Sequence, residues 1–222
     1  MALDSLLRAF VNNWWLARKI AKFFAAIGIS PNFLSVLSFF FAVFAGLFFF
    51  FAGNSNSTHS HYSFNFLLLL AGVFVCLNSF LDALDGVLAR EIGNASKKGD
   101  FLDHVIDRYS DVFIIGGIIF GGYVSWEIGI VAIIGVLLSS YMGTQAQAVG
   151  LRRVYGGLIG RADRLLIIIA ATFITLVYPH PIPASGLLSL LSFPFLGWTI
   201  VIFALLCNAT ALQRFFYTWR RI

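Results

Sequence analysis

Six apolar segments follow one another along this chain, and a short polar stretch separates each from the next. A membrane-spanning helix needs about 20 predominantly apolar residues, which each segment supplies, although the fifth is short. We therefore predict an all-α integral membrane protein with six transmembrane helices. Their approximate ranges are residues 33–53, 64–90, 100–124, 128–150, 163–178 and 187–212.

The residues before the first segment follow a different pattern. Apolar residues between positions 6 and 25 are interleaved with basic residues and tryptophans, namely Arg8, Trp14, Trp15, Arg18, Lys19 and Lys22. This combination is typical of a helix that lies in the headgroup region of a bilayer. We expect an amphipathic juxtamembrane helix within residues 1–28 and a six-helix transmembrane domain over residues 29–222.

The overall composition agrees with a membrane location. Of the 222 residues, 59% are hydrophobic and 11% are charged, and the mean hydropathy is +0.89. A soluble domain of this length could not bury so much apolar surface. The net charge of +5 would point to nucleic acid in a soluble protein. In a membrane protein the distribution of the charge matters more, and we expect no nucleic-acid partner.

The fifteen lysine and arginine residues all lie on one side of the predicted bundle. With six spans, they fall at the N-terminus, in the second-to-third and fourth-to-fifth connections, and at the C-terminus. The three other connections contain none. Because cytoplasmic loops are enriched in Lys and Arg, we expect both termini and the connection between segments two and three to face the cytoplasm.

Carboxylates gather on both sides of that second-to-third connection. In segment two, helical spacing places Asp82 and Asp85 on one face, within about 100° of Gly86 and Ala89. In segment three, four aspartates fall within about 80° by the same count, and these are Asp100, Asp103, Asp107 and Asp111. Because the connection is short, we expect the two helices to be antiparallel neighbours whose acidic faces meet near the cytoplasmic surface.

Such a cluster of carboxylates predicts a metal site. Ionisable groups within a membrane domain cost about 2.5 kcal/mol or more each on insertion scales, and they usually mark function. Carboxylates without imidazole or thiolate suit Mg²⁺, Mn²⁺ or Ca²⁺ better than zinc. Arg90, one turn beyond Gly86, could hold a phosphate. The alternative is a structural ion-pair network in which Arg90 and Arg108 answer the acids, but it leaves much of the negative charge unpaired.

The spacing of these residues resembles the signature of the CDP-alcohol phosphotransferases. The resemblance rests on Asp82-x₂-Asp85-Gly86-x₂-Ala89-Arg90-x₈-Gly99-x₃-Asp103-x₃-Asp107, in which every defining position is present. Pro31-Asn32 and the stretch from Gly157 to Leu165 are also similar to members of the family. The resemblance implies six transmembrane helices, a juxtamembrane N-terminal helix, a cytoplasmic-side site and a homodimer.

The same resemblance implies a reaction and roles for these residues. The hydroxyl of a small polar alcohol would attack the phosphorus that bears the lipid of a CDP-linked lipid, and CMP would leave. Asp82, Asp85, Asp103 and Asp107 would hold Mg²⁺ or Mn²⁺, with two ions expected, and Asp107 could also take the hydroxyl proton. The CDP and diphosphate would meet Asn32, Asp82, Asp85, Gly86, Ala89, Arg90 and Gly99. Asp100 and Asp111 lie outside the signature, and Asp111 is expected to play a supporting or structural role.

The acceptor alcohol is the part that the signature leaves open. A phosphate-bearing acceptor needs local positive charge, which Arg152, Arg153, Arg161 and Arg164 could supply. Arg164 resembles a phosphate-binding arginine of the members that use inositol phosphate. Those members place basic residues near the end of segment four, where this chain has Gln145 and Gln147, and either amide could bind an acceptor hydroxyl. We expect a polyol phosphate, inositol phosphate or glycerol phosphate, with serine or another uncharged or zwitterionic alcohol as the alternative.

Two more distant functions also use acids within a membrane. A membrane prenyltransferase binds a diphosphate through aspartates and Mg²⁺, but its acidic motifs normally come from two separate helix pairs, and Gly86-x-x-Ala89-Arg90 fits it poorly. A cation channel or transporter would carry further polar groups across the bilayer, whereas segments one and six are apolar through their middles. Both are therefore disfavoured.

Overall fold

The computed structural model describes residues 15–57, 61–93, 96–184 and 191–222. Its elements, in chain order, are α2 (Trp15–Ala26), α3 (Pro31–Ser57), α4 (His61–Glu91), α5 (Lys97–Phe120), α6 (Trp126–Ala148), α7 (Arg161–Val177), β1 (Ile182–Pro183), β2 (Ser192–Phe193) and α8 (Phe195–Trp219). The first part of the predicted juxtamembrane helix, including Arg8 and Trp14, lies outside the described residues.

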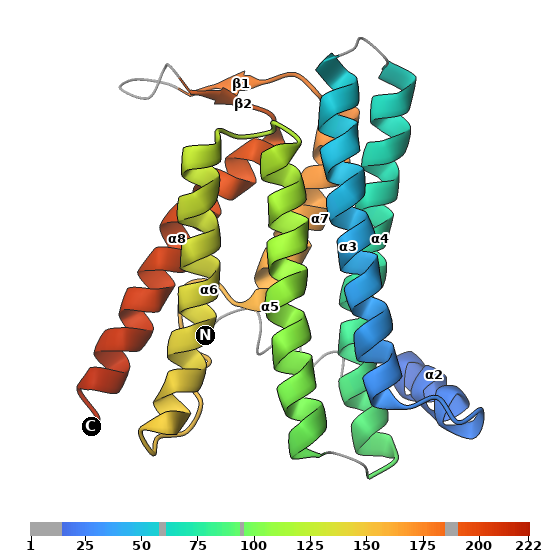
Figure 1. Cartoon of the computed structure of the whole chain (residues 1–222), viewed down its shortest axis with the longest axis vertical. Helices are drawn as coiled ribbons and strands as arrows, with labels where there is room; N and C mark the ends of the chain where they lie inside the picture. The colour runs from blue at the N-terminus through green and yellow to red at the C-terminus, as the bar shows by residue number, and fades with distance from the viewer. Residues whose placement is uncertain (1–14, 58–60, 94–95, 185–190) are drawn as a thin grey trace.

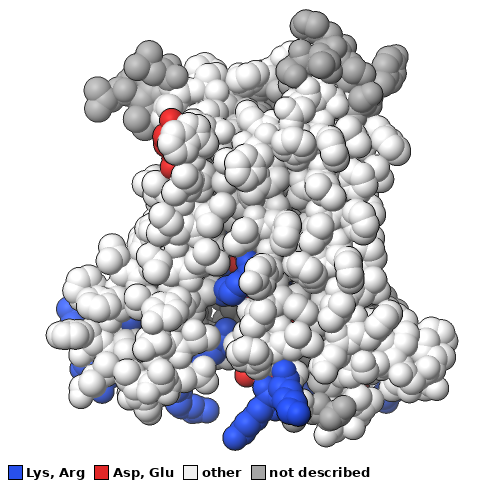
Figure 2. All heavy atoms as spheres, viewed as in Figure 1, with Lys and Arg blue, Asp and Glu red and all other residues white. Residues whose placement is uncertain are grey.

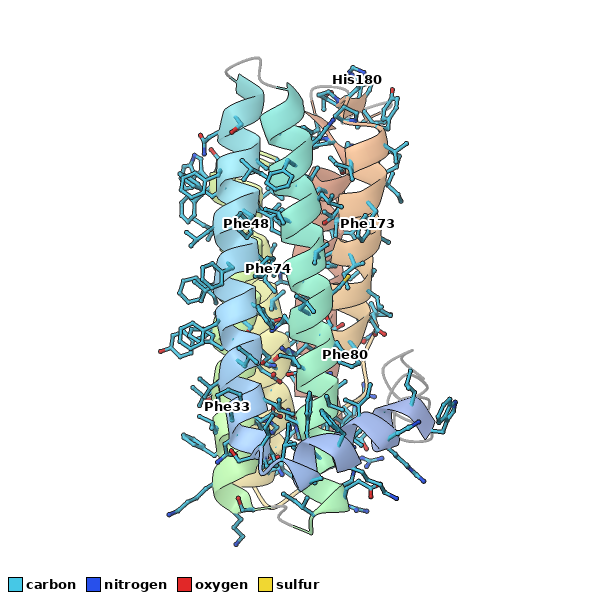
Figure 3. All side chains as sticks on the ribbon, turned by 90° about the vertical axis from the view of Figure 1, so that its right-hand side faces the viewer. Phe33, Phe48, Phe74, Phe80, Phe173 and His180 are labelled. Atoms are coloured by element: carbon cyan, nitrogen blue, oxygen red, sulfur yellow. The ribbon has the colours of Figure 1, made fainter. Side chains whose placement is uncertain are left out.

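Helices α3 to α8 run along the long axis of the molecule, and α2 lies across the lower end of α3 and α4 (Figures 1 and 3). Helix α2 buries Ala17 and Ala21, and Ala21 packs in one apolar cluster with Leu84 and Leu88 of α4. On its other side, Trp15 is exposed and Lys19 lies over the indole ring. This amphipathic arrangement is the one expected of an interfacial helix.

Four of the described helices, α3, α4, α6 and α8, are long and apolar enough to cross a membrane. The prediction of an integral membrane protein is therefore confirmed, whereas six spans are supported only in part. Helix α5 has 24 residues but carries Asp103, Asp107, Arg108 and Asp111, and α7 has only 17 residues. Both lie alongside the four apolar helices (Figure 1).

Helix α3 is the main neighbour of both acidic helices, which differs from the predicted direct packing of α4 on α5, although acids from both helices do meet at one arginine of α7. It packs along both α4 and α5, whereas α4 and α5 make almost no direct backbone contact within the described residues. Glycines allow α3 and α5 to approach closely: a Cβ on Gly117 would lie 2.1 Å from the carbonyl oxygen of Gly46, and a Cβ on Gly53 would lie 1.8 Å from that of Gly121. Larger side chains could not occupy these positions, so the glycines decide which helix becomes the neighbour of α5.

The other side of α3 packs on α4 through aromatic rings, as Figure 3 shows for Phe48 and Phe74. Their ring centroids are 5.2 Å apart. Other phenylalanines of α3, such as Phe40 and Phe44, are exposed, as expected of side chains that meet lipid. On the face drawn in Figure 2, basic side chains gather in the lower half, and mostly uncharged atoms cover the half above.

The last helix begins later than the sequence pattern predicts. Helix α8 starts at Phe195 rather than near residue 187 because Pro194 stands at its N-cap. The preceding Ser192 and Phe193 pair with Ile182 and Pro183 as a short antiparallel ladder. Trp198 Nε1 donates a hydrogen bond to the carbonyl of Ile182 and fixes this ladder to α8. The ladder is the one departure from an all-helical fold among the described residues, with residues 185–190 left aside.

Candidate active site

The two acids of α4 have different partners. Asp85 is buried, and its Oδ2 accepts a 2.5 Å hydrogen bond from Ser35 Oγ. Ser35 lies one turn after Pro31, the first residue of α3. The start of this helix is also fixed by a hydrogen bond from the Phe33 amide to Ser30 Oγ. Ser35 therefore joins the start of α3 to the acidic face of α4.

Helix α5 contributes Asp103, His104 and Asp107 to the opposite side. Each can place one ligand atom within 4.8 Å of the others. Ser96 caps this helix by accepting a hydrogen bond from the Gly99 amide at 3.1 Å. His104 lies between two aspartates of the signature. The sequence pattern did not identify it as a residue of the site.

Arg161, the first residue of α7, bridges the two acidic helices. Its Nη1 lies 2.6 Å from Asp82 Oδ2 on α4 and 2.8 Å from Asp107 Oδ1 on α5. The amide of Gly160 donates a 2.7 Å hydrogen bond to Asp163 Oδ2, which fixes the start of α7 at this point. The cluster thus contains a cation that comes from a helix outside the signature.

A second ion pair lies deeper in the bundle. Arg164 Nη2 is 2.7 Å from Asp111 Oδ2, and the two side chains are only 2% and 3% exposed. Arg108 lies 3.4 Å from Asp107 and 4.0 Å from Asp111. The structural ion-pair network considered from the sequence is therefore present in part. Arg108 does form ion pairs with acids, but Asp82 is paired with Arg161.

The cluster fits a divalent metal. Oδ1 of Asp82 is buried without a hydrogen-bond partner, and Oδ1 of Asp107 lies against the same Arg161 nitrogen that contacts Asp82. Buried polar atoms are rarely left unsatisfied in folded proteins, and an ion is one of the common explanations. Carboxylate oxygens are the ligands that Mg²⁺ and Mn²⁺ prefer.

The residues expected to bind CDP form two small groups beside this cluster. Asn32 Oδ1 lies 3.3 Å from the point that a Cβ of Gly99 would occupy. The guanidinium of Arg90 lies over Gly86, where a Cβ would be 3.5 Å from Nη1. Arg90 also lines a recess of about 350 Å³ together with Arg18, Val87 and Glu91. Ala89 is half-buried on the same helix.

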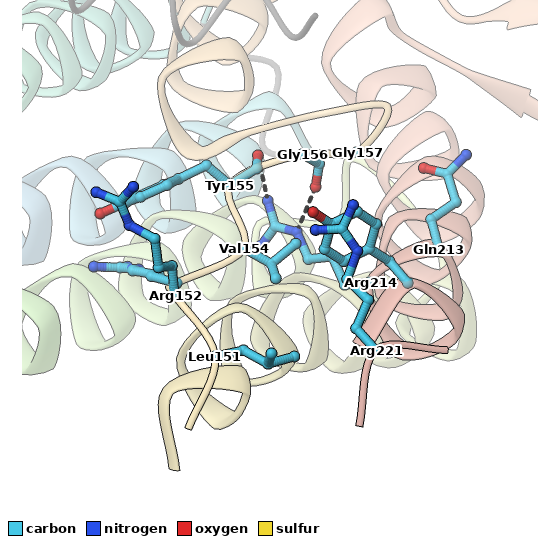
Figure 4. Close-up of a pocket in the computed structure, with 11 residues that line it drawn as sticks. Leu151, Arg152, Val154, Tyr155, Gly156, Gly157, Gln213, Arg214 and Arg221 are labelled. Atoms are coloured by element: carbon cyan, nitrogen blue, oxygen red, sulfur yellow. Dashed lines mark hydrogen bonds between the residues drawn. The ribbon is translucent and has the colours of Figure 1, made fainter. Parts of the chain in front are cut away.

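A larger cavity of about 500 Å³ lies between the connection from α6 to α7 and the end of the chain (Figure 4). Arg152, Arg153 and Tyr155 of the connection between α6 and α7 line it, together with Gln213 and Arg214 of α8 and with Arg221, which follows that helix. Arg214 Nε donates to the carbonyl of Gly156 at 2.7 Å and its Nη2 to that of Tyr155 at 3.1 Å, as the dashed lines in Figure 4 show. Arg214 thereby fixes the connection against α8.

The expected acceptor residues are divided by this geometry. Arg152 and Arg153 line the cavity, whereas Gln145 and Gln147 are exposed and are not among its described lining residues. Arg164 is buried against Asp111 and is likewise not part of this lining. Arg214 and Arg221 were counted only as charges of the cytoplasmic side, since a basic residue at the end of an apolar segment does not reveal which cavity it enters.

Comparison with known proteins places this fold and site in a family. The family model described as CDP-alcohol phosphatidyltransferase matches residues 28–219. The archaetidylinositol phosphate synthase of Pyrococcus horikoshii is 36% identical over 162 residues, which cover 72% of this chain and 77% of that protein.

Solved structures have the same fold. The phosphatidylinositol phosphate synthase of Mycobacterium tuberculosis with CDP-DAG bound superposes with a TM-score of 0.70 at 23% identity, covering 91% of this chain and 93% of that one. The same protein in complex with manganese and citrate gives a TM-score of 0.71 at 23% identity, covering 91% and 88%. With the family model spanning almost the whole chain, this protein belongs to the CDP-alcohol phosphatidyltransferases, a family of membrane enzymes of phospholipid synthesis.

Proposed function

We propose that this enzyme transfers a phosphatidyl-type group from a CDP-linked lipid to the hydroxyl of a polyol phosphate, with inositol phosphate as the first candidate. The observation that carries the proposal is the position of Arg153. It lines the basic cavity and also donates a hydrogen bond to His104, which lies between the acids of α5. A phosphate held in this cavity would be adjacent to the acid cluster. The names of the similar synthases support inositol phosphate.

The proposed reaction is a single displacement at phosphorus. The acceptor oxygen forms a bond to the phosphorus that bears the lipid, and the bond from that phosphorus to the bridging oxygen of the diphosphate breaks. CMP leaves with the electron pair, and Asp107 takes the proton of the hydroxyl. Positioning and charge stabilisation dominate such reactions, and a well-placed base contributes about 10²–10⁴-fold.

We propose that Asp82, Asp85, Asp103 and Asp107 bind two divalent ions, Mg²⁺ or Mn²⁺. Bound ions would stabilise the negative charge that develops on the diphosphate oxygens. The unsatisfied Oδ1 of Asp82 supports this assignment, as does the manganese complex of the mycobacterial synthase. The diphosphate and nucleotide would contact the residues that lie beside the acid cluster, namely Asn32, Gly86, Ala89, Arg90 and Gly99.

We assign acceptor binding to Arg152 and Arg153, with Arg161 at the boundary between acceptor and metal. Arg164, in the first turn of α7, is buried against Asp111 of α5, so it is not assigned to the acceptor. Gln145 and Gln147 are too far along the exposed end of α6 to be first candidates. This revision follows from the burial of Arg164 and from the lining of the cavity.

The topology is also part of the proposal. We propose that α5 and α7 complete a set of six spans in the domain over residues 29–222, because they lie alongside the four apolar helices. By the distribution of basic residues, the site and both termini face the cytoplasm, and residues 1–28 lie on that surface of the cell membrane. A homodimer is proposed on family resemblance, and chemical cross-linking in native membranes would test it.

The decisive experiment measures CMP release from the purified protein with a CDP-linked lipid, Mn²⁺ or Mg²⁺ and one acceptor at a time. Inositol phosphate, glycerol phosphate, inositol and serine form the panel, and mass spectrometry identifies the lipid product. We expect release with a polyol phosphate. Release with serine or inositol alone would refute the proposed acceptor, and no release with any member of the panel would refute the reaction.

A further inference from the structure

His104 has two possible uses at the edge of the acid cluster. Its Nδ1 lies 3.7 Å from Asp103 Oδ2, and the residue belongs to the group that could hold a metal. Its Nε2 lies on the other side of the ring, 3.6 Å from Asp100 Oδ1. The same Nε2 receives a hydrogen bond from Nη1 of Arg153, which is 49 residues away in the chain.

The chemistry of the two partners decides between these uses. A guanidinium has hydrogen-bond donors and no acceptor, so Nε2 of His104 must be the acceptor in this pair. A neutral imidazole has one protonated nitrogen and one with a lone pair, which puts the ring proton on Nδ1. A protonated Nδ1 has no lone pair to offer to a metal. While Arg153 is bound, His104 therefore faces the acceptor cavity rather than the metal.

Arg153 is held on two sides. Its guanidinium carbon lies 5.0 Å from the centroid of the Tyr155 ring, and one of its N–H groups donates a hydrogen bond to His104. A guanidinium carries five N–H donors in a planar fork, so a single bond to His104 leaves donors for an anion in the cavity that Arg153 lines.

We propose that His104 is a positioning residue for the acceptor: it fixes Arg153 at the junction between the basic cavity and the acid cluster, and it is not a metal ligand. This inference rests on the proposed function. Ordering a long side chain during binding costs about 0.5–1.5 kcal/mol, which corresponds to roughly two- to tenfold in affinity. His104 removes that cost before the acceptor arrives.

Two near-isosteric variants separate the uses. In His104→Gln the amide oxygen reaches about as far as Nε2, whereas in His104→Asn the oxygen lies near the position of Nδ1. The full-length protein would be assayed in lipid nanodiscs for the KM of the acceptor. Mn²⁺ binding would be measured by electron paramagnetic resonance without CDP-lipid or acceptor. Thermal unfolding shows that each variant is folded.

We expect His104→Gln to keep the acceptor KM within about twofold, and His104→Asn to raise it roughly two- to tenfold. Mn²⁺ affinity should stay near that of the wild type in both. Arg153→Ala should raise the KM at least as much, and adding His104→Asn to it should change little more, because the two residues act through one contact. Weaker Mn²⁺ binding in His104→Gln with retention in His104→Asn would instead identify a metal ligand and overturn the proposal.

Equal acceptor KM values in the wild type and in both His104 variants would also overturn it. Failure of the proposed function is distinguishable from these results. If the wild type released no CMP with any polyol phosphate, the proposed acceptor would be wrong, and the positioning role would fall with it. If the wild type is active and His104→Gln behaves like His104→Asn, only the positioning role is wrong.

Discussion

Arg161 Nη1 lies 2.8 Å from Asp107 Oδ1, so a guanidinium stands against the residue proposed as the general base. The same nitrogen contacts Asp82, and both acids are proposed metal ligands. Arg161 thus neutralises part of the charge that a divalent ion would neutralise when bound. We expect a bound ion to take over this role from Arg161, so the thermal stability of the helix bundle should depend on the metal.

We predict that Arg161→Gln lowers the thermal stability in the presence of a chelator, because removing one partner of a buried ion pair costs about 3–5 kcal/mol. Mn²⁺ should then raise the unfolding temperature of this variant more than that of the wild type. Thermal unfolding in detergent with and without Mn²⁺ measures both effects. Arg152→Gln, at an exposed arginine of the neighbouring connection, is the matched control. If Mn²⁺ raised the unfolding temperature of Arg161→Gln and of the wild type by the same amount, the idea that a bound ion takes over the role of Arg161 would be contradicted.

Asp107→Asn should reduce CMP release by roughly 100-fold or more, since the amide can neither accept the hydroxyl proton nor carry charge. Asp100→Asn on the same helix is the control, because the Asp100 side chain is 75% exposed and lies outside the signature. Initial rates at saturating CDP-lipid and acceptor compare the two. A rate for Asp107→Asn close to that of Asp100→Asn would remove Asp107 from the mechanism.

Ser35→Ala should weaken Mn²⁺ binding about 10- to 100-fold, which is typical when a group that orients a metal ligand is removed. The hydroxyl of Ser35 orients Asp85, so Ser35→Thr should retain binding. Ser38→Ala is the control, because it also removes a buried hydroxyl from α3. Among its described contacts, that hydroxyl donates a hydrogen bond only to the Ser35 carbonyl. A Mn²⁺ titration that could not tell Ser35→Ala from Ser38→Ala would disprove the role of Ser35.

Gly117→Ala should destabilise the protein, by about 1–3 kcal/mol as in other overpacked cores. The added methyl would lie 2.1 Å from the Gly46 carbonyl oxygen, and backbone would have to move. The adjacent Gly116 has open space at its Cβ position. Gly116→Ala should therefore be neutral or stabilising by up to about 1 kcal/mol, because alanine is the better helix former. Unfolding midpoints of the two variants in the same detergent test this pair.

Arg164→Ala should act mainly on stability, with a loss of about 3–5 kcal/mol, because it leaves Asp111 charged and buried. Replacing both partners, as in Arg164→Met with Asp111→Leu, should recover much of that loss. Unfolding midpoints and the acceptor KM are to be measured together. If Arg164→Met with Asp111→Leu were as stable as the wild type but its acceptor KM rose tenfold or more, Arg164 would bind acceptor after all.

The sequence predicted the helices well because their signals are local. The apolar runs located α3 to α7 within a few residues, and helical spacing put Asp82 and Asp85 on one face. The exception is α8, which was predicted over residues 187–212 and spans Phe195–Trp219. Its start was placed too early because Leu191 to Pro194 is apolar enough to be read as helix, although Ser192 and Phe193 form the preceding ladder and Pro194 is the N-cap.

The arrangement of the helices could not be read in the same way. Chain order suggested that α4 and α5 pack directly on each other, yet both pack mainly on α3, where glycines such as Gly46 and Gly117 permit a close approach. Likewise, Arg161 meets Asp82 across 79 residues and Arg153 meets His104 across 49. Such contacts depend on how helices dock, and the hydrophobic pattern of a single helix carries no information about its partner.

The deep ion pair of Asp111 and Arg164 also bears on how the nascent chain enters the membrane. Asp111 is synthesised 53 residues before Arg164, and an aspartate near the centre of a helix opposes insertion by about 2.5–3.5 kcal/mol. Until α7 has emerged from the ribosome, Arg108 of α5 itself is the one basic partner of Asp111 among the described residues. We expect α5 to remain at the translocon or at the membrane surface until α7 arrives, so that the two helices settle into the bilayer together.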